Sequence, residues 1–161
     1  MQQDDKPRRL ALVASKGTLD EAYPPLILAS TAAAMDMEVA IFFTFYGLDI
    51  VNKKKYAHLK VSPIANPAMP MPVPMPNIVL GLPGMGPMAT SMMKSKFRGK
   101  NVAEIRELLD AARELDVHLI ACQMTMDVFG YAQDEFVDGV EFGGAAAFLS
   151  EARKAHVTLF I

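Results

Sequence analysis

The chain has 161 residues, of which 52% are apolar and 21% are charged. This composition excludes a disordered chain, and the length suits one domain with a substantial core. The net charge is −2, and the only basic cluster, residues 53–55, is short and predicts a solvated helix end, so we expect no nucleic-acid partner. The single cysteine and an amino-terminal segment without a secretory pattern predict a cytoplasmic protein.

Strand-like and helix-like segments alternate in the first third of the chain. Residues 8–15 predict a buried strand. A helix follows, because Thr18 and Glu21 have capping-box spacing. Residues 38–45 are rich in β-branched and aromatic side chains and predict a second strand. Residues 47–56 predict a short helix.

A segment rich in proline and methionine follows, at about 61–93, and it carries no charge. It is long enough to span a bilayer, but its recurrent prolines remove backbone donors and obstruct a helix. We expect an extended loop that packs against another subunit, with contact to a membrane surface as the alternative. Within and beyond this loop, residues 77–82 predict a short strand and residues 86–97 a brief helix.

The clearest helical pattern lies in residues 101–116, where apolar residues form one stripe. We expect Asn101 and Glu104 to cap this helix. A strand at 117–121 and a helix at 123–130 follow.

The chain ends with an acidic, turn-rich connector at 131–141, a helix at 142–155 and a strand at 157–161. Strands that alternate with helices predict right-handed crossovers. The expected fold is therefore a three-layer α/β/α domain with a mostly parallel central sheet of about five strands. We expect a single domain over residues 1–161.

Cys122 lies where the strand at 117–121 gives way to a helix. In an open α/β sheet, ligands gather at the carboxyl ends of the strands. A helix N-terminus offers free N–H groups that favour a thiolate, which is the nucleophilic form of cysteine. This position predicts a reactive, catalytic cysteine. The alternative is that Cys122 is a buried small hydrophobe, because free cysteines are among the most buried residues.

No histidine is placed to activate Cys122. His118 is four residues away, which is about 13 Å along a strand, and is better explained as a core histidine. His58 and His156 can approach only through the fold. A cysteine–histidine hydrolase is therefore disfavoured, and the sequence favours a thiolate stabilised by backbone dipoles.

The loop after the first strand is expected at the same sheet edge as Cys122. Ser15, Lys16 and Thr18 of this loop could bind an anion, and Gly17 allows the backbone to turn tightly, but a plain capped turn is the favoured interpretation. Tyr46 follows the second strand in the same way and is a candidate pocket residue. The candidate substrate or partner pocket is completed by Gln123 and Met124, which open the helix after Cys122.

Metal and cofactor binding find little support in the sequence. One cysteine and three scattered histidines give no zinc-site spacing. Met69, Met71 and Met75 offer thioether ligands for copper(I), but methionine more commonly fills irregular apolar surface. We predict no metal and no cofactor.

Several stretches resemble the DsrE/DsrF-like family. They are "LIACQMTMDVFG", "DGVEFGGAAAFLSEA" and the closing "VTLFI", together with "FFTFYGL" and "GLPGMGPMATSMMKSK". The resemblance covers nearly the whole chain and is greatest for the branch found beside rhodanese and TusA-type sulfur carriers in sulfur-metabolising bacteria and archaea.

The resemblance implies a layered α/β/α homo-oligomer, sometimes membrane-associated, whose cysteine accepts sulfane sulfur as a persulfide. That role falls on Cys122, with a rhodanese-like donor and a TusA-like carrier as partners. Because the chain has no second cysteine, a single-cysteine carrier or sulfurtransferase is expected. The alternatives are a non-catalytic scaffold or membrane-docking subunit of a sulfur-relay complex and, less well supported, a thiol peroxidase that needs an external thiol.

Overall fold

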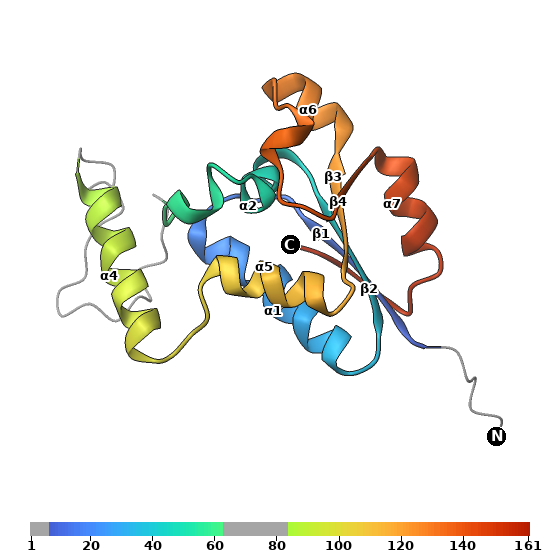
Figure 1. Ribbon diagram of the computed structural model, residues 1–161, viewed down its shortest axis with the longest axis horizontal. Helices are drawn as coiled ribbons and strands as arrows, with labels where there is room; N and C mark the ends of the chain where they lie inside the picture. The colour runs from blue at the N-terminus through green and yellow to red at the C-terminus, as the bar shows by residue number, and fades with distance from the viewer. Residues whose placement is uncertain (1–6, 63–83) are drawn as a thin grey trace.

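The computed structural model describes residues 7–62 and 84–161, and its centre is a five-stranded sheet (Figure 1). The strand order is β4-β3-β2-β1-β5, and every pair of neighbouring strands is parallel. The predicted α/β sheet of about five strands is confirmed. The strands are β1 (Arg9–Ala14), β2 (Glu38–Phe43), β3 (His118–Cys122), β4 (Val140–Gly143) and β5 (Val157–Phe160).

Helices cover both faces of the sheet, which confirms the three-layer expectation. Helices α1 (Leu19–Ala34) and α5 (Ile105–Glu114) pack together on one face, and α7 (Ala145–Ala152) lies on the other (Figure 1). Successive strand residues point to opposite faces. The face under α1 and α5 therefore buries one set, including Leu12 and Leu119, while Ile120 packs under α7 with Phe148.

The remaining helical segments lie around the sheet edges. Helix α6 follows β3, and α4 lies beside α1 and α5 (Figure 1). The helices expected at 86–97 and 123–130 are confirmed. Within residues 7–62 and 84–161, no helix combines the length and apolarity needed to cross a bilayer. These segments are η1 (Phe45–Gly47), α2 (Leu48–Val51), η2 (Tyr56–His58), α4 (Met85–Gly99), α6 (Gln123–Phe129) and η3 (Gln133–Glu135).

The edge strand β4 was not predicted from the sequence. Residues 131–141 were expected as a connector and 142–155 as a helix, but β4 pairs with β3 and α7 begins only at Ala145. The four residues of β4, which end in Gly143, have too weak a strand pattern to be recognised from the sequence, and pairing with β3 makes them a strand. The strand expected at 77–82 and the candidate copper ligands Met69, Met71 and Met75 lie outside the described residues.

Two helix caps differ from expectation. Thr18 occupies the N-cap of α1, but its hydroxyl makes no capping hydrogen bond and Glu21 pairs with Lys16 instead. Asn101 adopts a positive φ of 54° four residues before α5, so it does not cap that helix. Glu104 is the N-cap, and its backbone N–H donates to a carboxylate oxygen of Glu107, 2.7 Å away.

The basic cluster at residues 53–55 is not the end of a helix, because α2 stops at Val51. Each lysine instead forms an ion pair. Two of these pairs join the loop after β2 to the connector before β4, where Asn52 and Phe136 also form an antiparallel bridge. The pairs are Lys53–Asp138 at 3.1 Å, Lys54–Glu135 at 2.8 Å and Lys55–Asp49 at 3.0 Å.

Candidate functional site

The carboxyl ends of β1, β2 and β3 lie side by side at one edge of the sheet. Ala14 pairs with Phe43, and Phe43 pairs in turn with Ala121, the residue before Cys122. The loops that follow β1 and β2 and the start of α6 therefore meet at this edge (Figure 1). The expectation that residues 14–20 share an edge with Cys122 is confirmed.

Two glycines lock the loops after β1 and β2 together. A Cβ atom at Gly17 would overlap the carbonyl oxygen of Tyr46, and a Cβ atom at Gly47 would overlap that of Ala14. The Gly47 N–H also donates to the Ser15 carbonyl over 3.3 Å. Only residues without side chains permit such close backbone contact, so these glycines fix the two loops beside Cys122.

Cys122 ends β3 and is the N-cap residue of α6, with extended φ and ψ angles of −70° and 109°. Its side chain is 4% exposed and lies under α7 with Phe42 and Ile120. The thiol is free, as expected for a single cysteine. Cys122 is therefore almost inaccessible to solvent and lies at the N-terminus of a helix.

Two threonines and the first turn of α6 place hydrogen-bond donors near Cys122, although its side chain makes no capping hydrogen bond to α6. Burial raises the pKa of this thiol, but the Thr125 hydroxyl and backbone N–H, the Thr44 hydroxyl and the Met124 backbone N–H together lower it below its ordinary value. Met124 and Thr125 are the second and third residues of α6, whose N–H groups have no partner inside the helix. The net effect of these donors is to favour the thiolate, and among the described residues no cationic side chain contributes to the lowered pKa.

The predicted pocket residues after β1 are occupied by contacts within the chain. The Ser15 hydroxyl and backbone N–H both donate to the Ile161 carbonyl, at 3.0 and 2.9 Å. Lys16 pairs with Glu21 at 3.0 Å on the surface. Gly17 contacts the backbone of Tyr46. These residues therefore shape the edge rather than offer free anion-binding groups.

The other predicted pocket residues lie in η1 and at the start of α6. Tyr46 is 67% exposed and its ring centre lies 5.7 Å from that of Phe129 on α6. Met124 is 55% exposed. Gln123 donates to Asp127 one turn along α6, at 3.0 Å. Tyr46 and Met124 thus present apolar surface at the edge where the thiol lies.

Comparison with known families agrees with this geometry. The family model described as DsrE/DsrF/DrsH-like matches residues 6–160. The chain belongs to the DsrE/DsrF/DrsH-like family. The chain is 52% identical to sulfur carrier protein DsrE2 of Allochromatium vinosum over 158 residues. The match covers 96% of this chain and 98% of DsrE2.

More distant similarities extend over the same length. The uncharacterised protein YrkE of Bacillus subtilis is 33% identical over 161 residues, which cover 98% of this chain and 99% of YrkE. The crystal structure of the Escherichia coli YchN protein superposes with a TM-score of 0.54, covering 96% of this chain and 99% of YchN. At 12% identity, the YchN similarity shows a shared fold.

Thr44 and Thr125 are contacts of the cysteine in this DsrE/DsrF/DrsH-like chain that sequence reasoning did not identify. Their hydroxyl oxygens lie 3.3 Å apart, and the Phe45 N–H donates to the Thr125 hydroxyl, also over 3.3 Å. Thr125 follows Cys122 by three residues, the spacing of an N-cap and its N3 partner, so this spacing was an available signal. Thr44 is 78 positions earlier and carried no such signal.

His118 lies at the amino end of β3, away from the edge that holds Cys122. Its Nε2 atom is 2.8 Å from a carboxylate oxygen of Glu141 on β4. The sequence predicted that His118 is too far from Cys122 to act as its base, and this placement agrees with that prediction. The expectation of a core histidine is wrong, because the side chain is half-exposed at the border of the sheet.

Proposed function

We propose that Cys122 carries sulfane sulfur between partner thiols. The observation that carries the proposal is the buried thiol held by the donors of Thr125, Thr44 and Met124, which lower its pKa. A relative that is 52% identical is named a sulfur carrier protein, and this name supports the same role here. The lowered pKa increases the fraction of Cys122 that is thiolate, and the thiolate is the nucleophile.

The sulfur atom keeps its oxidation state during the transfer, so the reaction needs no external oxidant or reductant. The Cys122 thiolate attacks the outer sulfur of a donor persulfide, R–S–SH. A sulfur–sulfur bond to Cys122 forms while the donor's sulfur–sulfur bond breaks, and the donor leaves as a thiol or thiolate. An acceptor thiolate then attacks the outer sulfur, takes it as a new persulfide and regenerates the Cys122 thiolate.

In this proposal the residues near the sulfur stabilise its charge, position the loop after β2 or contact a partner protein. The Thr125 and Met124 N–H groups and the two threonine hydroxyls stabilise negative charge on Cys122 before attack and after release. The Gly17–Tyr46 and Gly47–Ala14 contacts hold the loop carrying Thr44 against the strand ends. Tyr46 and Met124 supply exposed apolar surface on which a partner protein can pack.

Intact mass spectrometry tests the proposal directly. The protein is incubated with polysulfide or with a persulfidated carrier of the TusA type, and we expect a reversible gain of about 32 Da, one sulfur atom. Cys122→Ser removes the gain, while Thr31→Val, an exposed change on α1, preserves it. A wild-type protein that takes up no sulfur from any of these donors contradicts the proposal, as does a gain that survives in Cys122→Ser.

A non-catalytic scaffold is the second candidate, and the 4% exposure of Cys122 favours it. This candidate predicts slow labelling of the native thiol by iodoacetamide and partner binding that Cys122→Ser leaves unchanged. Sulfur transfer predicts that a partner promotes labelling or takes sulfur from Cys122. Consumption of hydrogen peroxide in the presence of an external thiol separates the thiol peroxidase alternative from both.

The proposed partners are a rhodanese-like donor, a TusA-like acceptor and a second copy of this chain. The edge strand β5 supports self-association, because all four of its residues are exposed and Phe160 is 76% exposed. An exposed apolar edge strand favours pairing with another chain. Light scattering after size exclusion is expected to give an oligomer for the wild type and a smaller species for Phe160→Glu. The cytoplasmic location and contact with a membrane surface stay predictions.

A further inference from the structure

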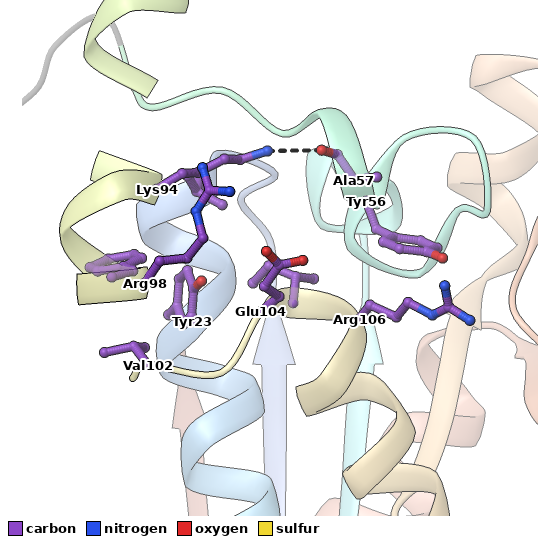
Figure 2. Close-up of a pocket in the computed structure, with 11 residues that line it drawn as sticks. Tyr23, Tyr56, Ala57, Lys94, Arg98, Val102, Glu104 and Arg106 are labelled. Carbon is purple, nitrogen blue, oxygen red and sulfur yellow. Dashed lines mark hydrogen bonds between the residues drawn. The ribbon is translucent and has the colours of Figure 1, made fainter. Parts of the chain in front are cut away.

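A cavity of about 250 Å³ lies between α4, η2 and the first turns of α1 and α5 (Figure 2). Its lining includes Leu19 and Tyr23 from α1, Phe97 and Arg98 from α4, and Glu104 before α5. None of its lining residues belongs to α6, and Cys122 is not among them. The proposed sulfur chemistry therefore leaves this cavity without a role.

Apolar and aromatic side chains form the wall of the cavity. Leu19, Tyr23 and Ile105 are buried, so this wall is part of the packed core. The Tyr23 and Phe97 rings meet edge to face, with centres 4.8 Å apart and planes at 73°. Tyr56 adds a third ring on the η2 side (Figure 2). Aromatic walls favour a flat ring as the apolar part of a ligand.

Three cations and one carboxylate line the same cavity, which gives it an excess of positive charge. Lys94 donates to the neutral Ala57 carbonyl over 2.9 Å, and Arg98 makes no ion pair within the described part of the chain. The Arg106 guanidinium is 3.8 Å from Asp110, at the limit of an ion pair. Figure 2 shows Lys94 and Arg98 on α4 facing Glu104. An excess of cations over carboxylates favours an oxyanion.

Tyr23 contributes a hydrogen-bond donor to this cavity. Burial, together with the negative charges of Glu104 and Glu107, raises the pKa of Tyr23, so its hydroxyl is protonated at neutral pH. The hydroxyl points towards the cavity (Figure 2). A ligand oxygen placed between Tyr23 and Arg98 would receive a neutral and a charged donor, which fixes its orientation.

The volume limits the size of the ligand. Cavities that hold drug-sized ligands enclose roughly 300–1,000 Å³, so 250 Å³ suits a molecule smaller than a nucleotide. At about 30 Å³ per water molecule, the cavity has the volume of about eight waters, which a single ring with one charged group fills.

We propose that this cavity binds a small aromatic oxyanion, its ring against Tyr23 and Phe97 and its charged group beside Lys94 and Arg98 (Figure 2). The shared chemistry is an aryl phosphate, sulfonate or carboxylate. The site is separate from Cys122, and its occupancy does not depend on sulfur transfer.

Fluorine NMR with 4-fluorophenyl phosphate tests the site in the full-length protein. We expect saturable broadening of the probe signal and much weaker binding of the neutral 4-fluorobenzyl alcohol. Phenyl phosphate is expected to displace the probe better than inorganic phosphate does. An absence of saturable binding, equal binding of the neutral analogue or equal displacement by inorganic phosphate overturns the proposal.

Matched variants locate the binding. Arg98→Ala is expected to weaken binding about tenfold, the effect of a lost hydrogen bond to a charged group. Lys100→Ala, an equal charge change next to α4 but outside the cavity lining, is expected to stay within about twofold of wild type. Arg98 is exposed, so the unfolding midpoint is expected to stay close to that of the wild type. Equal weakening by both variants overturns the proposal.

Cys122→Ser separates this inference from the proposed sulfur chemistry. The variant is expected to bind 4-fluorophenyl phosphate with wild-type affinity, because Cys122 does not line the cavity. Loss of binding in Cys122→Ser contradicts a separate site. Wild-type binding together with an absence of sulfur uptake leaves the cavity assignment standing and contradicts only the sulfur-carrier proposal.

Discussion

The two ends of β3 hold its two ionisable side chains in opposite kinds of surroundings. At the amino end, His118 is half-exposed and lies 2.8 Å from the Glu141 carboxylate. At the carboxyl end, about 13 Å further along the strand, Cys122 is almost fully buried among hydroxyl and backbone N–H donors. At the amino end, an imidazole lies beside a largely exposed carboxylate. The carboxyl end favours a thiolate with fixed dipoles alone, because it lies where a helix begins.

The largest expected effect comes from separating the loops at the carboxyl end. Gly47→Ala places a Cβ atom against the Ala14 carbonyl oxygen, and backbone on both sides must move. We expect a loss of roughly 1–3 kcal/mol in the free energy of unfolding, as for other overpacked sites, measured by urea denaturation. Gly99→Ala is the control, because a Cβ atom there meets nothing within 4 Å. Equal stability of the two variants would contradict the locked-loop geometry.

The next effect tests the hydroxyl donor. Thr125→Val keeps the side-chain shape but removes a donor to Cys122 and leaves the Phe45 N–H without its acceptor. We expect the pKa of Cys122 to rise and its alkylation at pH 7 to slow by roughly threefold to tenfold. The rate is measured by iodoacetamide trapping and mass spectrometry.

Thr31→Val provides the control for this substitution, because Thr31 is exposed on α1. It is expected to leave the alkylation rate unchanged. An unchanged rate in Thr125→Val, with the fold confirmed by circular dichroism, would show that the backbone donors suffice.

The pH dependence has a defined sign at the cysteine end. Because the folded state lowers the pKa of Cys122, the thiolate adds stability that is fully present above the pKa of the denatured thiol. That stability is lost as the pH falls through the folded pKa. Alkylation of the native protein should therefore rise at lower pH than alkylation in denaturant, and Cys122→Ser should lose the pH-dependent part of the unfolding free energy. Coincident titrations would contradict the lowered pKa.

The smallest effect is expected at the other end of β3. His118→Gln removes the contact with Glu141, a partly exposed pair worth about 0–1 kcal/mol. Alkylation of Cys122 is expected to stay within about twofold of wild type, since the two side chains lie at opposite ends of the strand. The same iodoacetamide assay measures this, with wild type as the reference. A large loss of thiol reactivity would mean that the two ends are coupled.

Local patterns were enough to predict most of the fold. Alternating buried strands and helices gave the parallel three-layer sheet, and the change of pattern after residue 121 placed Cys122 at a strand end and helix start. The edge strand β4 was missed because its four residues have little pattern of their own and depend on pairing with β3. The Asn101 cap was wrong because the chain turns with a positive φ there and begins α5 four residues later.

The sequence by itself determined the chemistry available at this edge, namely one cysteine at a helix start and no local base. Only the tertiary structure decided what surrounds that cysteine. Parallel pairing brings the end of β2 beside the end of β3, so that Thr44 reaches a sulfur 78 positions away, and the glycine contacts hold it there. Hydrogen bonds between distant segments depend on how the strands align, and the spacing of residues along the chain does not contain that alignment.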